Sequence, residues 1–118
     1  MGVQIAAHLA NVEVPTVLLD LPSDGPDRSA IARKSVAGLG KMNPPPLFVR
    51  ERAGLIEVGN FEDDLARLAD CDWIVEAIAE KLEWKRDLWR RVAGHRRADA
   101  VVSSNTSGLP LGQIAEGF

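Results

Sequence analysis

The sequence predicts an α/β protein whose parallel sheet has helices wound on both sides. Three short apolar runs, TVLLD, DWIVEAIA and AVVSS, have the composition of strands, and the first is typical of a strand buried on both faces. Segments with helical spacing of apolar residues separate the runs, and the connections are short. Strands that alternate with helices in this way are the pattern of a parallel sheet.

The first part of the chain is predicted to begin with a helix, a strand and a second helix. Gly2 lies in the first turn of the opening helix, where a backbone passes close to another group. The strand is expected at Thr16–Asp20. Asp27 or Ser29 can cap the second helix, which is expected to end near Lys41.

A proline-rich segment and a short strand are expected next. The run NPPP excludes a helix and predicts a stiff, extended connection at the surface. LIEV is predicted as a strand, followed by a turn at Gly59 and Asn60. Asn60 is expected to cap a two-turn helix over FEDDLARLAD, whose early acids suit the positive end of a helix.

The second half is predicted to repeat the order of strand and helix. A strand over DWIVEAIA precedes a helix with a wide apolar stripe. The stripe contains Leu82, Trp84, Leu88, Trp89 and Val92. A further strand through Val101 and Val102 is followed by a polar turn and a short final helix.

Length and composition indicate one folding unit without a nucleic-acid or membrane partner. The chain has 118 residues and a net charge of −3, with both signs mixed along it. No apolar run reaches the roughly 20 residues of a membrane span, and the start does not resemble a signal peptide, so we expect a cytoplasmic location. Cys71 is the only cysteine and is expected at a loop-to-strand junction, and no metal site is predicted.

Asp20 is the first candidate binding residue, because ligands of open parallel sheets lie beyond the carboxyl ends of the strands. It follows Gly2 by 18 positions, close to the roughly 20-residue spacing of an acid that binds both hydroxyls of an adenosine ribose. A carboxylate here would repel a 2′-phosphate and so favours NAD over NADP. The alternative is that Asp20 only caps the next turn.

Glu76, Glu80 and Lys85 form the second candidate group. Lys85 is one turn into the helix that follows the strand, a spacing that lets its ammonium meet Glu80. Such a pair could hold a ribose or contact a pyrophosphate. The alternative is a solvated ion pair that contributes little to stability.

The third candidate is SSNTSG, a cluster of hydroxyls and amides directly after a strand. It could place neutral donors where a substrate oxygen reacts, or it could be only a helix-entry turn. His8 and His95 lie in predicted helices far from this turn, which excludes a nucleophilic triad.

Read in order, five segments resemble the NAD-binding domain of the 3-hydroxyacyl-CoA dehydrogenases, specifically the bacterial long-chain form. They are GVQIAAHLAN, VLLD, GNFEDDL, DWIVEAIAEKLEWK and VVSSNTSGLP. The resemblance covers essentially the whole chain and implies a Rossmann-type doubly wound sheet. In that family a strand and G-x-G-x-x-G begin the domain, and Met1 and Gly2 correspond to the last two motif residues. We therefore expect residues 1–118 to be a partial domain that lacks the first strand and the family's C-terminal helical domain.

The resemblance also implies roles for individual residues. Gly2, Asp20, Glu80 and Lys85 correspond to residues that contact NAD, and Ser107 corresponds to a catalytic serine that meets both the nicotinamide side and the acyl substrate. The family reaction oxidises a 3-hydroxyacyl-CoA to the 3-oxoacyl-CoA in fatty-acid β-oxidation. The family's catalytic histidine and its glutamate lie beyond the equivalent of the last residue here, so we expect this isolated chain to be catalytically silent.

Partner expectations follow from the same resemblance and from the missing strand. The full-length parent would bind an acyl-CoA substrate, and the open sheet favours a homo-oligomer or a strand-exchanged dimer. Two other functions remain open. The chain could be the cofactor half of another 3-hydroxy acid dehydrogenase, which the NTSG turn disfavours, or a non-catalytic remnant that binds nucleotide or associates with itself.

Overall fold

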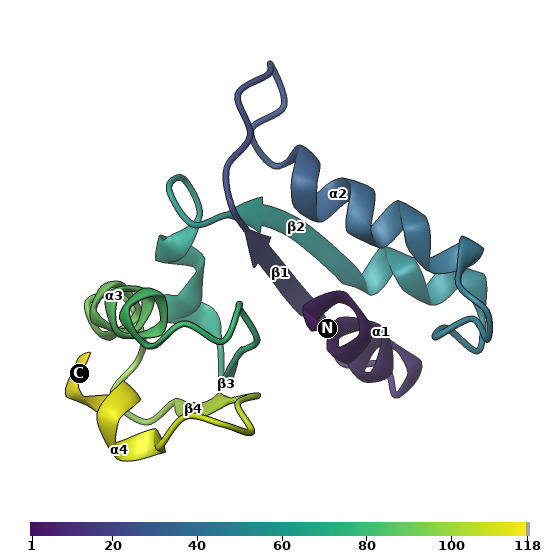
Figure 1. Ribbon diagram of the computed structural model, residues 1–118. Helices are drawn as coiled ribbons and strands as arrows, with labels where there is room; N and C mark the ends of the chain where they lie inside the picture. Colours follow the sequence, from purple (N-terminus) through teal and green to yellow (C-terminus); the bar gives the residue numbers. More distant parts are fainter. Residues whose placement is uncertain (118) are drawn as a thin grey trace. The chain divides into compact units, whose positions relative to one another are not determined.

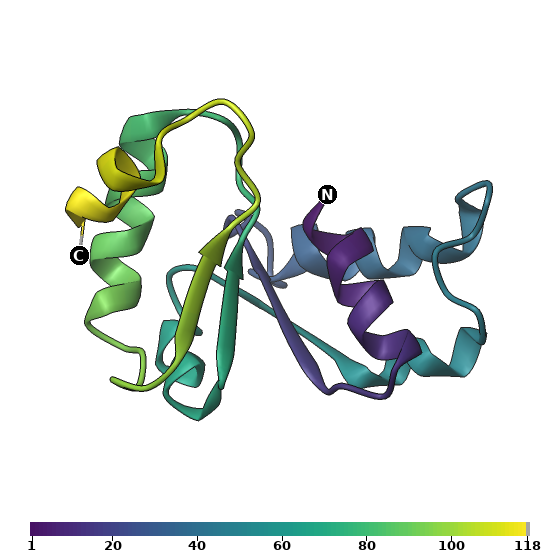
Figure 2. The ribbon, with the colours of Figure 1, turned by 90° about the horizontal axis from the view of Figure 1, so that it is seen from below.

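The computed structural model describes residues 1–117 and contains two compact units, residues 1–64 and the residues from 65 onward. Phe118, the last residue of the predicted domain, lies outside the described residues. Each unit is built on two parallel strands joined through a helix (Figures 1 and 2). The predicted α/β class is therefore confirmed, with two compact units where the chain length predicted one.

The first unit follows the predicted order closely. Its helices are α1 (Gly2–Asn11) and α2 (Ala30–Ala37), and the 3₁₀ turns η1 (Gly38–Lys41) and η2 (Arg50–Leu55) extend the helical structure. Its strands are β1 (Thr16–Asp20) and β2 (Ile56–Asn60). The two strands pair in parallel, with Thr16 opposite Ile56 and Asp20 opposite Asn60, so both strands end at the same edge.

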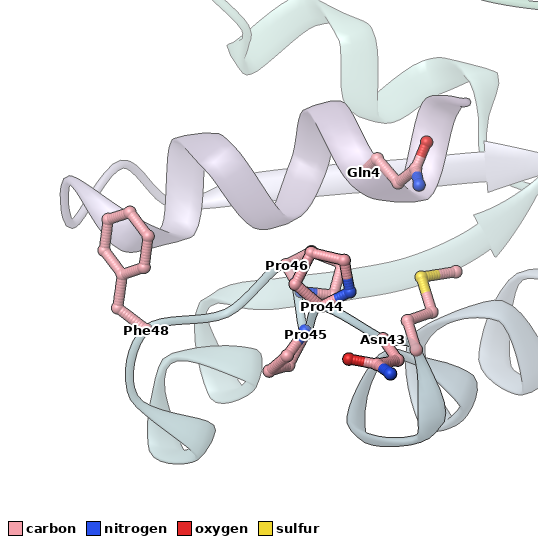
Figure 3. Close-up of a pocket in the computed structure, with 7 residues that line it drawn as sticks. Gln4, Asn43, Pro44, Pro45, Pro46 and Phe48 are labelled. Atoms are coloured by element: carbon pink, nitrogen blue, oxygen red, sulfur yellow. The ribbon is translucent and has the colours of Figure 1, made fainter.

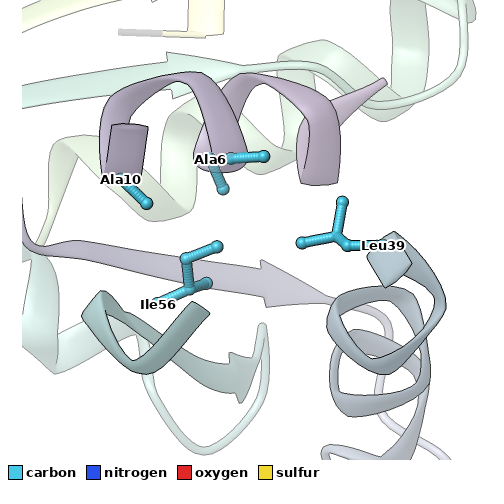
Figure 4. Packing of buried hydrophobic residues seen from close by; sticks show 5 residues of the cluster. Ala6, Ala10, Leu39 and Ile56 are labelled. Atoms are coloured by element: carbon cyan, nitrogen blue, oxygen red, sulfur yellow. The ribbon is translucent and has the colours of Figure 1, made fainter. Parts of the chain in front are cut away.

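Small side chains let α1 pack closely against the rest of the first unit. Ala6, Ala7 and Ala10 of α1 are buried with Leu39 and Ile56 in one apolar cluster (Figure 4). Alanine has no side chain beyond Cβ, so the helix backbone can approach the strands. All five residues of β1 are half-buried, whereas the sequence predicted a strand buried on both faces.

The proline-rich connection is fixed to the end of α1 by Asn11. The Asn11 side chain donates to the carbonyl of Pro46 at 2.9 Å and accepts the amide of Phe48 at 2.9 Å. The prolines supply no backbone donors of their own, so these two contacts attach the segment to the unit.

The end of β2 differs from the prediction. Gly59 and Asn60 belong to the strand rather than to a turn, and no α-helix follows them at residues 61–70. The Asn60 side-chain oxygen accepts the amides of Glu62 and Asp63 at 2.9 and 2.8 Å, which closes a tight turn in place of the first helical turn. The only helical structure in this stretch is the 3₁₀ turn η3 (Leu65–Asp70), in the second unit.

The second unit contains the predicted strands and helix in shortened form. Its elements are β3 (Trp73–Glu76), α3 (Leu82–Ala93), β4 (Val101–Ser104) and α4 (Leu111–Ile114). Strands β3 and β4 pair in parallel, with Glu76 opposite Ser104. The strand predicted over DWIVEAIA ends at Glu76, because the Glu76 carboxylate accepts the amide of Ile78 and turns the chain.

The buried face of α3 matches only part of the predicted apolar stripe. Leu88, Trp89 and Val92 are buried, but Trp84 is 54% exposed and the Lys81 ammonium lies 4.3 Å from its ring centroid. Lys85 takes the buried position on the first turns of the helix instead. A charged residue therefore occupies part of the face that packs on the strands, and its contacts define the site.

Candidate functional site

The predicted site residues lie at strand and helix ends in both units. Gly2 begins α1, and Asp20 is the last residue of β1. In the second unit, Glu80 and Lys85 flank the start of α3, and Ser107 lies in the turn after β4.

Asp20 makes a local contact at the carboxyl end of β1. Its Oδ1 accepts the amide of the next residue, Leu21, at 2.7 Å, and Asp20 is half-buried. Its backbone carbonyl accepts the amide of Phe61, which ties the ends of the two strands together. These contacts cap the turn and orient the carboxylate, so they agree with both predicted roles of Asp20.

Glu76 and Lys85 form a buried ion pair in the second unit. The Lys85 Nζ lies 2.7 Å from the Glu76 Oε1, and the two side chains are 0% and 3% exposed. The sequence did not predict this pairing of Glu76 with Lys85, since the predicted ion pair was that of Lys85 with Glu80, whose side chain is 45% exposed. The helix turns Lys85 inward, toward the strand that Glu76 ends, and packing of α3 removes both charges from water.

The Glu76 carboxylate joins the ends of β3 and β4. Its Oε1 also accepts the amide of Ile78 at 2.7 Å, and its Oε2 accepts the hydroxyl of Ser104. The Glu76 carbonyl accepts the amide of Asn105 at 2.7 Å. Several donors thus compensate the buried negative charge, as burial of a carboxylate requires.

Glu80 connects the buried pair to the turn after β4. Its Oε1 lies 3.2 Å from the Lys85 Nζ, and its Oε2 accepts the Thr106 hydroxyl at 2.8 Å and the Gly108 amide at 3.4 Å. The hydrogen bond from Thr106, followed by those from Lys85 and Gly108, lowers the pKa of the Glu80 carboxyl. Glu80 is therefore held as a carboxylate at the surface.

Ser107 lies between the two residues that bind Glu80. It is exposed, while Thr106 on one side and Gly108 on the other are attached to the Glu80 carboxylate. The Thr106 Oγ1 also accepts the amide of Leu109 at 3.2 Å. The turn therefore presents the Ser107 hydroxyl from a backbone that is fixed on both sides.

Sequence reasoning missed two partners of this network, Ser104 and Thr106. Both belonged to the SSNTSG cluster, which was interpreted as a whole. The parallel register places Ser104 opposite Glu76, and that register could be inferred only once the ends of both strands were known. Thr106 reaches Glu80 across 26 positions of sequence, a contact that no local pattern indicates.

The other candidate groups lie outside this network. His8 and His95 are exposed, and Cys71 is half-buried two residues before β3, where burial raises the pKa of its thiol. Residues 1–117 contain no cluster of three or more His, Cys, Asp or Glu side chains suited to a metal ion. Within the same residues, no helix has the length and apolar character needed to cross a membrane.

A hollow in the first unit lies beside the proline-rich connection (Figure 3). Gln4, Phe48 and residues 42–46 line it, and most of these side chains are apolar. The predicted site residues are not among those that line it.

Comparison with known proteins identifies the family. Residues 1–118 match the family model described as the 3-hydroxyacyl-CoA dehydrogenase, NAD binding domain. A probable 3-hydroxyacyl-CoA dehydrogenase of Deinococcus radiodurans is 48% identical over 99% of this chain and 34% of its own length. A putative fatty acid oxidation complex trifunctional enzyme of Rickettsia felis is 40% identical over 98% of this chain and 16% of its own length.

The fold also matches a solved structure. The crystal structure of FadB2 from M. tuberculosis has a TM-score of 0.77 and 26% sequence identity, over 99% of this chain and 41% of that one. The chain therefore spans about a third of the length of the Deinococcus relative and less than half of FadB2. These matches confirm the Rossmann-type fold and support NAD as the cofactor. The chain belongs to the family of NAD-binding domains of the 3-hydroxyacyl-CoA dehydrogenases.

Proposed function

We propose that residues 1–118 supply the NAD-binding part of an enzyme that oxidises a 3-hydroxyacyl-CoA to the 3-oxoacyl-CoA in fatty-acid oxidation. The observation that carries the proposal is the turn after β4, where the exposed Ser107 stands between two residues held by the Glu80 carboxylate. The Deinococcus relative is named as a probable 3-hydroxyacyl-CoA dehydrogenase and the Rickettsia relative as a putative fatty acid oxidation enzyme, which supports the reaction and the pathway.

The residues present suit a dinucleotide. Asp20 offers a carboxylate at the carboxyl end of a parallel strand, the position from which an acid binds the two hydroxyls of an adenosine ribose. Gly2 begins a ten-residue helix, whose first amides favour a pyrophosphate. Bound NAD would supply the hydride acceptor.

Glu80 and Ser107 are proposed to act on the nicotinamide half of the cofactor and on the substrate. Glu80 is 45% exposed at its side chain and charged, so it can accept a hydroxyl hydrogen bond while it holds the turn. Ser107 has a hydroxyl that can donate to a substrate oxygen, and its exposure leaves that hydroxyl accessible. We assign Ser107 the catalytic contact with the acyl substrate.

The partners and location are proposed with the function. The substrate class is an acyl-CoA, and the location is the cytoplasm. We also propose self-association, as a homo-oligomer or a strand-exchanged dimer. In the described residues β1 pairs with β2 alone and β3 with β4 alone, so strand edges remain that can pair with another chain.

Calorimetric titration of the 118-residue chain with NAD and with NADP tests the cofactor proposal. We expect NAD to bind more tightly than NADP, and Asp20→Ala to weaken NAD binding and remove the preference. Asp24→Ala, which removes an exposed acid from the following loop, is the matched control and should bind as the wild type does. Equal affinity of the wild type for both dinucleotides would contradict the role of Asp20.

The reaction is tested in a full-length enzyme that contains this domain. NADH absorbance is followed with a 3-hydroxyacyl-CoA, and we expect turnover that Ser107→Ala lowers about 10²-fold, the usual cost of removing one neutral donor to a reacting oxygen. Turnover with other 3-hydroxy acids and none with the CoA thioester would overturn the substrate class.

A further inference from the structure

Two loops lie at the edge of the first unit where Asp20 ends β1. Residues 21–29 follow β1 and residues 61–64 follow β2, and the parallel register sets Asp20 opposite Asn60. Dinucleotide-binding proteins of this fold hold the adenosine ribose at such an edge, and those that take NADP use an arginine nearby for the 2′-phosphate. Arg28 is the only lysine or arginine in these two loops. The surroundings of Arg28 therefore bear on the choice between NAD and NADP.

Arg28 is paired with an acid of the other loop. Its Nε donates to the Asp63 Oδ2 at 2.7 Å, and both side chains are about half exposed. The hydrogen bond and the charge of Asp63, ahead of the charges of Glu62 and Asp24, hold the pKa of Arg28 above its usual value. The guanidinium is therefore charged, and a carboxylate already balances its charge.

The buried Asn60 holds the Asp63 carboxylate in place. The Asn60 side-chain amide donates to the same Asp63 Oδ2 at 3.1 Å and to the Ser29 hydroxyl at 3.2 Å. The Asn60 Oδ1 accepts the Asp63 backbone amide at 2.8 Å, so both ends of Asp63 are attached to one buried side chain. A carboxylate fixed in this way has little side-chain freedom left to lose when it binds Arg28.

The loop that carries Arg28 is closed by its own hydrogen bonds. The Ser23 amide donates to the Arg28 carbonyl at 3.0 Å, and the Ser23 hydroxyl donates to the Asp27 carbonyl at 2.7 Å. The Asp27 Oδ1 in turn accepts the Ser29 amide at 3.1 Å. The backbone therefore presents Arg28 at a defined place, within reach of the turn after β2.

We propose that Asp63 is a specificity-determining residue for the cofactor, which disfavours NADP because its carboxylate competes with the 2′-phosphate for Arg28. A 2′-phosphate that reaches Arg28 must displace the Asp63 carboxylate or lie beside it, and the two negative charges repel each other. NAD carries a hydroxyl at that position and meets no such competition. The inference rests on the function proposed above, because Asp20 must hold the ribose for its 2′-position to face these loops.

Calorimetric titration of Asp63→Asn with NADP and with NAD tests the competition. The substitution keeps the size of the side chain, and we expect the NADP affinity to rise about fivefold, as loss of an exposed ion pair permits, and the NAD affinity to change less than about twofold. A merely structural role would lower both affinities together. Glu13→Gln is the matched control, because it removes one charge and releases Arg52 ahead of β1. An NADP affinity that Asp63→Asn leaves unchanged, or that Glu13→Gln raises equally, would overturn the proposal.

A double-mutant cycle with Arg28→Gln shows whether the released arginine causes the gain. We expect Asp63→Asn to raise the NADP affinity in the wild-type background and not in the Arg28→Gln background. An equal gain without Arg28 would assign the effect to the loss of a negative charge alone and overturn the proposal. Arg28→Gln by itself should lower the NADP affinity less than about twofold, because Asp63 already occupies the guanidinium. A loss of about tenfold would show that Arg28 binds the 2′-phosphate in spite of Asp63, which contradicts the inference.

Inorganic phosphate tests the availability of Arg28 without a dinucleotide. NMR follows the Arg28 Nε signal as phosphate is added, with chloride at equal ionic strength as the control. We expect phosphate to shift this signal in Asp63→Asn and much less in the wild type, because a released guanidinium can bind the anion. The same response in the two proteins, or none in either, would overturn the proposal. If the wild-type chain binds neither NAD nor NADP, the proposed cofactor role fails for this chain, while the phosphate titration still decides whether Asp63 blocks Arg28.

Discussion

The two units end their strands with different kinds of buried polar side chain. Asn60, 1% exposed, is the last residue of β2 in the first unit, and Glu76, 5% exposed, is the last residue of β3 in the second. Both accept backbone amides from the residues that follow and so turn the chain after the strand. The same local task is performed by a neutral amide in one unit and by a carboxylate in the other.

The difference lies in the partners that each side chain requires. Asn60 is satisfied by two amides within three residues and by donation to Ser29 and Asp63. Glu76 carries a charge and needs Lys85 from α3 and Ser104 from β4 as well. Both side chains tie their turn to the tertiary structure, since Asn60 reaches Ser29 across 31 positions, but of the two Glu76 alone needs a cation.

Among the single substitutions, Lys85→Met is expected to lower the free energy of unfolding most. The substitution keeps most of the side-chain volume and leaves the Glu76 carboxylate buried beside no cation, so we expect a loss of about 3–5 kcal/mol in the free energy of unfolding. Urea unfolding measures the total, and amide exchange assigns the loss to the second unit. A loss shared equally by the two units would contradict the local origin of the effect.

The Glu76→Gln and Lys85→Met pair provides the control for that prediction. The double variant leaves no lone buried charge. We therefore expect its free energy of unfolding to exceed that of Lys85→Met by about 1–3 kcal/mol, although one more side chain has been changed. If the double variant were less stable than Lys85→Met, the loss of volume and hydrogen bonds, rather than an unpaired charge, would cause the destabilisation by Lys85→Met.

Asn60→Ala should have a smaller effect than Lys85→Met. It removes acceptors from the amides of Glu62 and Asp63, but these residues are exposed and water can replace the side-chain oxygen. We expect a loss of about 1–2 kcal/mol in the free energy of unfolding. Gln4→Ala, which removes an exposed amide from α1, should change it little. If Asn60→Ala lost as much stability as Lys85→Met, the buried charge at the end of β3 would be no more costly to disrupt than the buried amide at the end of β2.

Gly59→Ala tests the close packing beside Asn60. A Cβ at residue 59 would lie 2.7 Å from the Asp64 Oδ2 and 2.8 Å from the Leu19 Cδ2, so both side chains must move. The Asp64 carboxylate also accepts the Asn60 amide, and its movement weakens that contact. Because both obstacles are side-chain ends, we expect a modest loss of about 1 kcal/mol, measured by urea unfolding.

Gly38→Ala is the matched control for that substitution. Gly38 has helical backbone angles, and nothing lies within 4 Å of a Cβ built there. The alanine should stabilise the first unit by about 0.4–1 kcal/mol, because it reduces the freedom of the unfolded chain. Equal effects of the two alanines would show that packing at Gly59 is not tight in solution.

Local patterns predicted the elements of this fold better than their ends. The strand at Thr16–Asp20 and the helix that contains Leu88 were recovered, because composition and helical spacing are local signals. The end of β2 was placed too early, since Gly59 and Asn60 are typical of turns and only strand pairing extends β2 through them. Propensity was overridden by tertiary pairing at that point.

In the candidate site, too, local spacing predicted one contact, whereas tertiary packing determined the others. The spacing of Glu80 and Lys85 predicted that they meet, and they do. Their burial could not be predicted, because it depends on how α3 packs on β3, which brings Glu76 and Lys85 together across nine positions. The roles of Gly2, Asp20, Glu80, Lys85 and Ser107 toward NAD and substrate remain predictions; the calorimetric titration addresses Asp20, and the turnover assay addresses Ser107.

Thr106→Val gives the smallest and most specific effect, a change in the pH dependence of stability. Hydrogen bonding to Thr106 is the main cause that lowers the pKa of Glu80 in the folded chain below its unfolded value. The unfolded chain therefore binds more protons between the two values, and this stabilisation is present above the unfolded pKa and lost as the pH falls through the folded pKa. The valine variant should have a lower melting temperature than the wild type near neutral pH, and the difference should shrink as the pH falls through that window.

Thr16→Val separates this linkage from the loss of a hydroxyl. The Thr16 hydroxyl donates to the carbonyl of Val14 at 3.0 Å, a neutral acceptor that does not titrate, so its valine variant should differ from the wild type by an amount independent of pH. If the Thr106→Val difference were equally constant, Thr106 would stabilise the turn without acting on the Glu80 charge. If only the Thr106→Val difference depends on pH, the Thr106 hydroxyl stabilises the turn that presents Ser107 through its hydrogen bond to the charged Glu80 carboxylate.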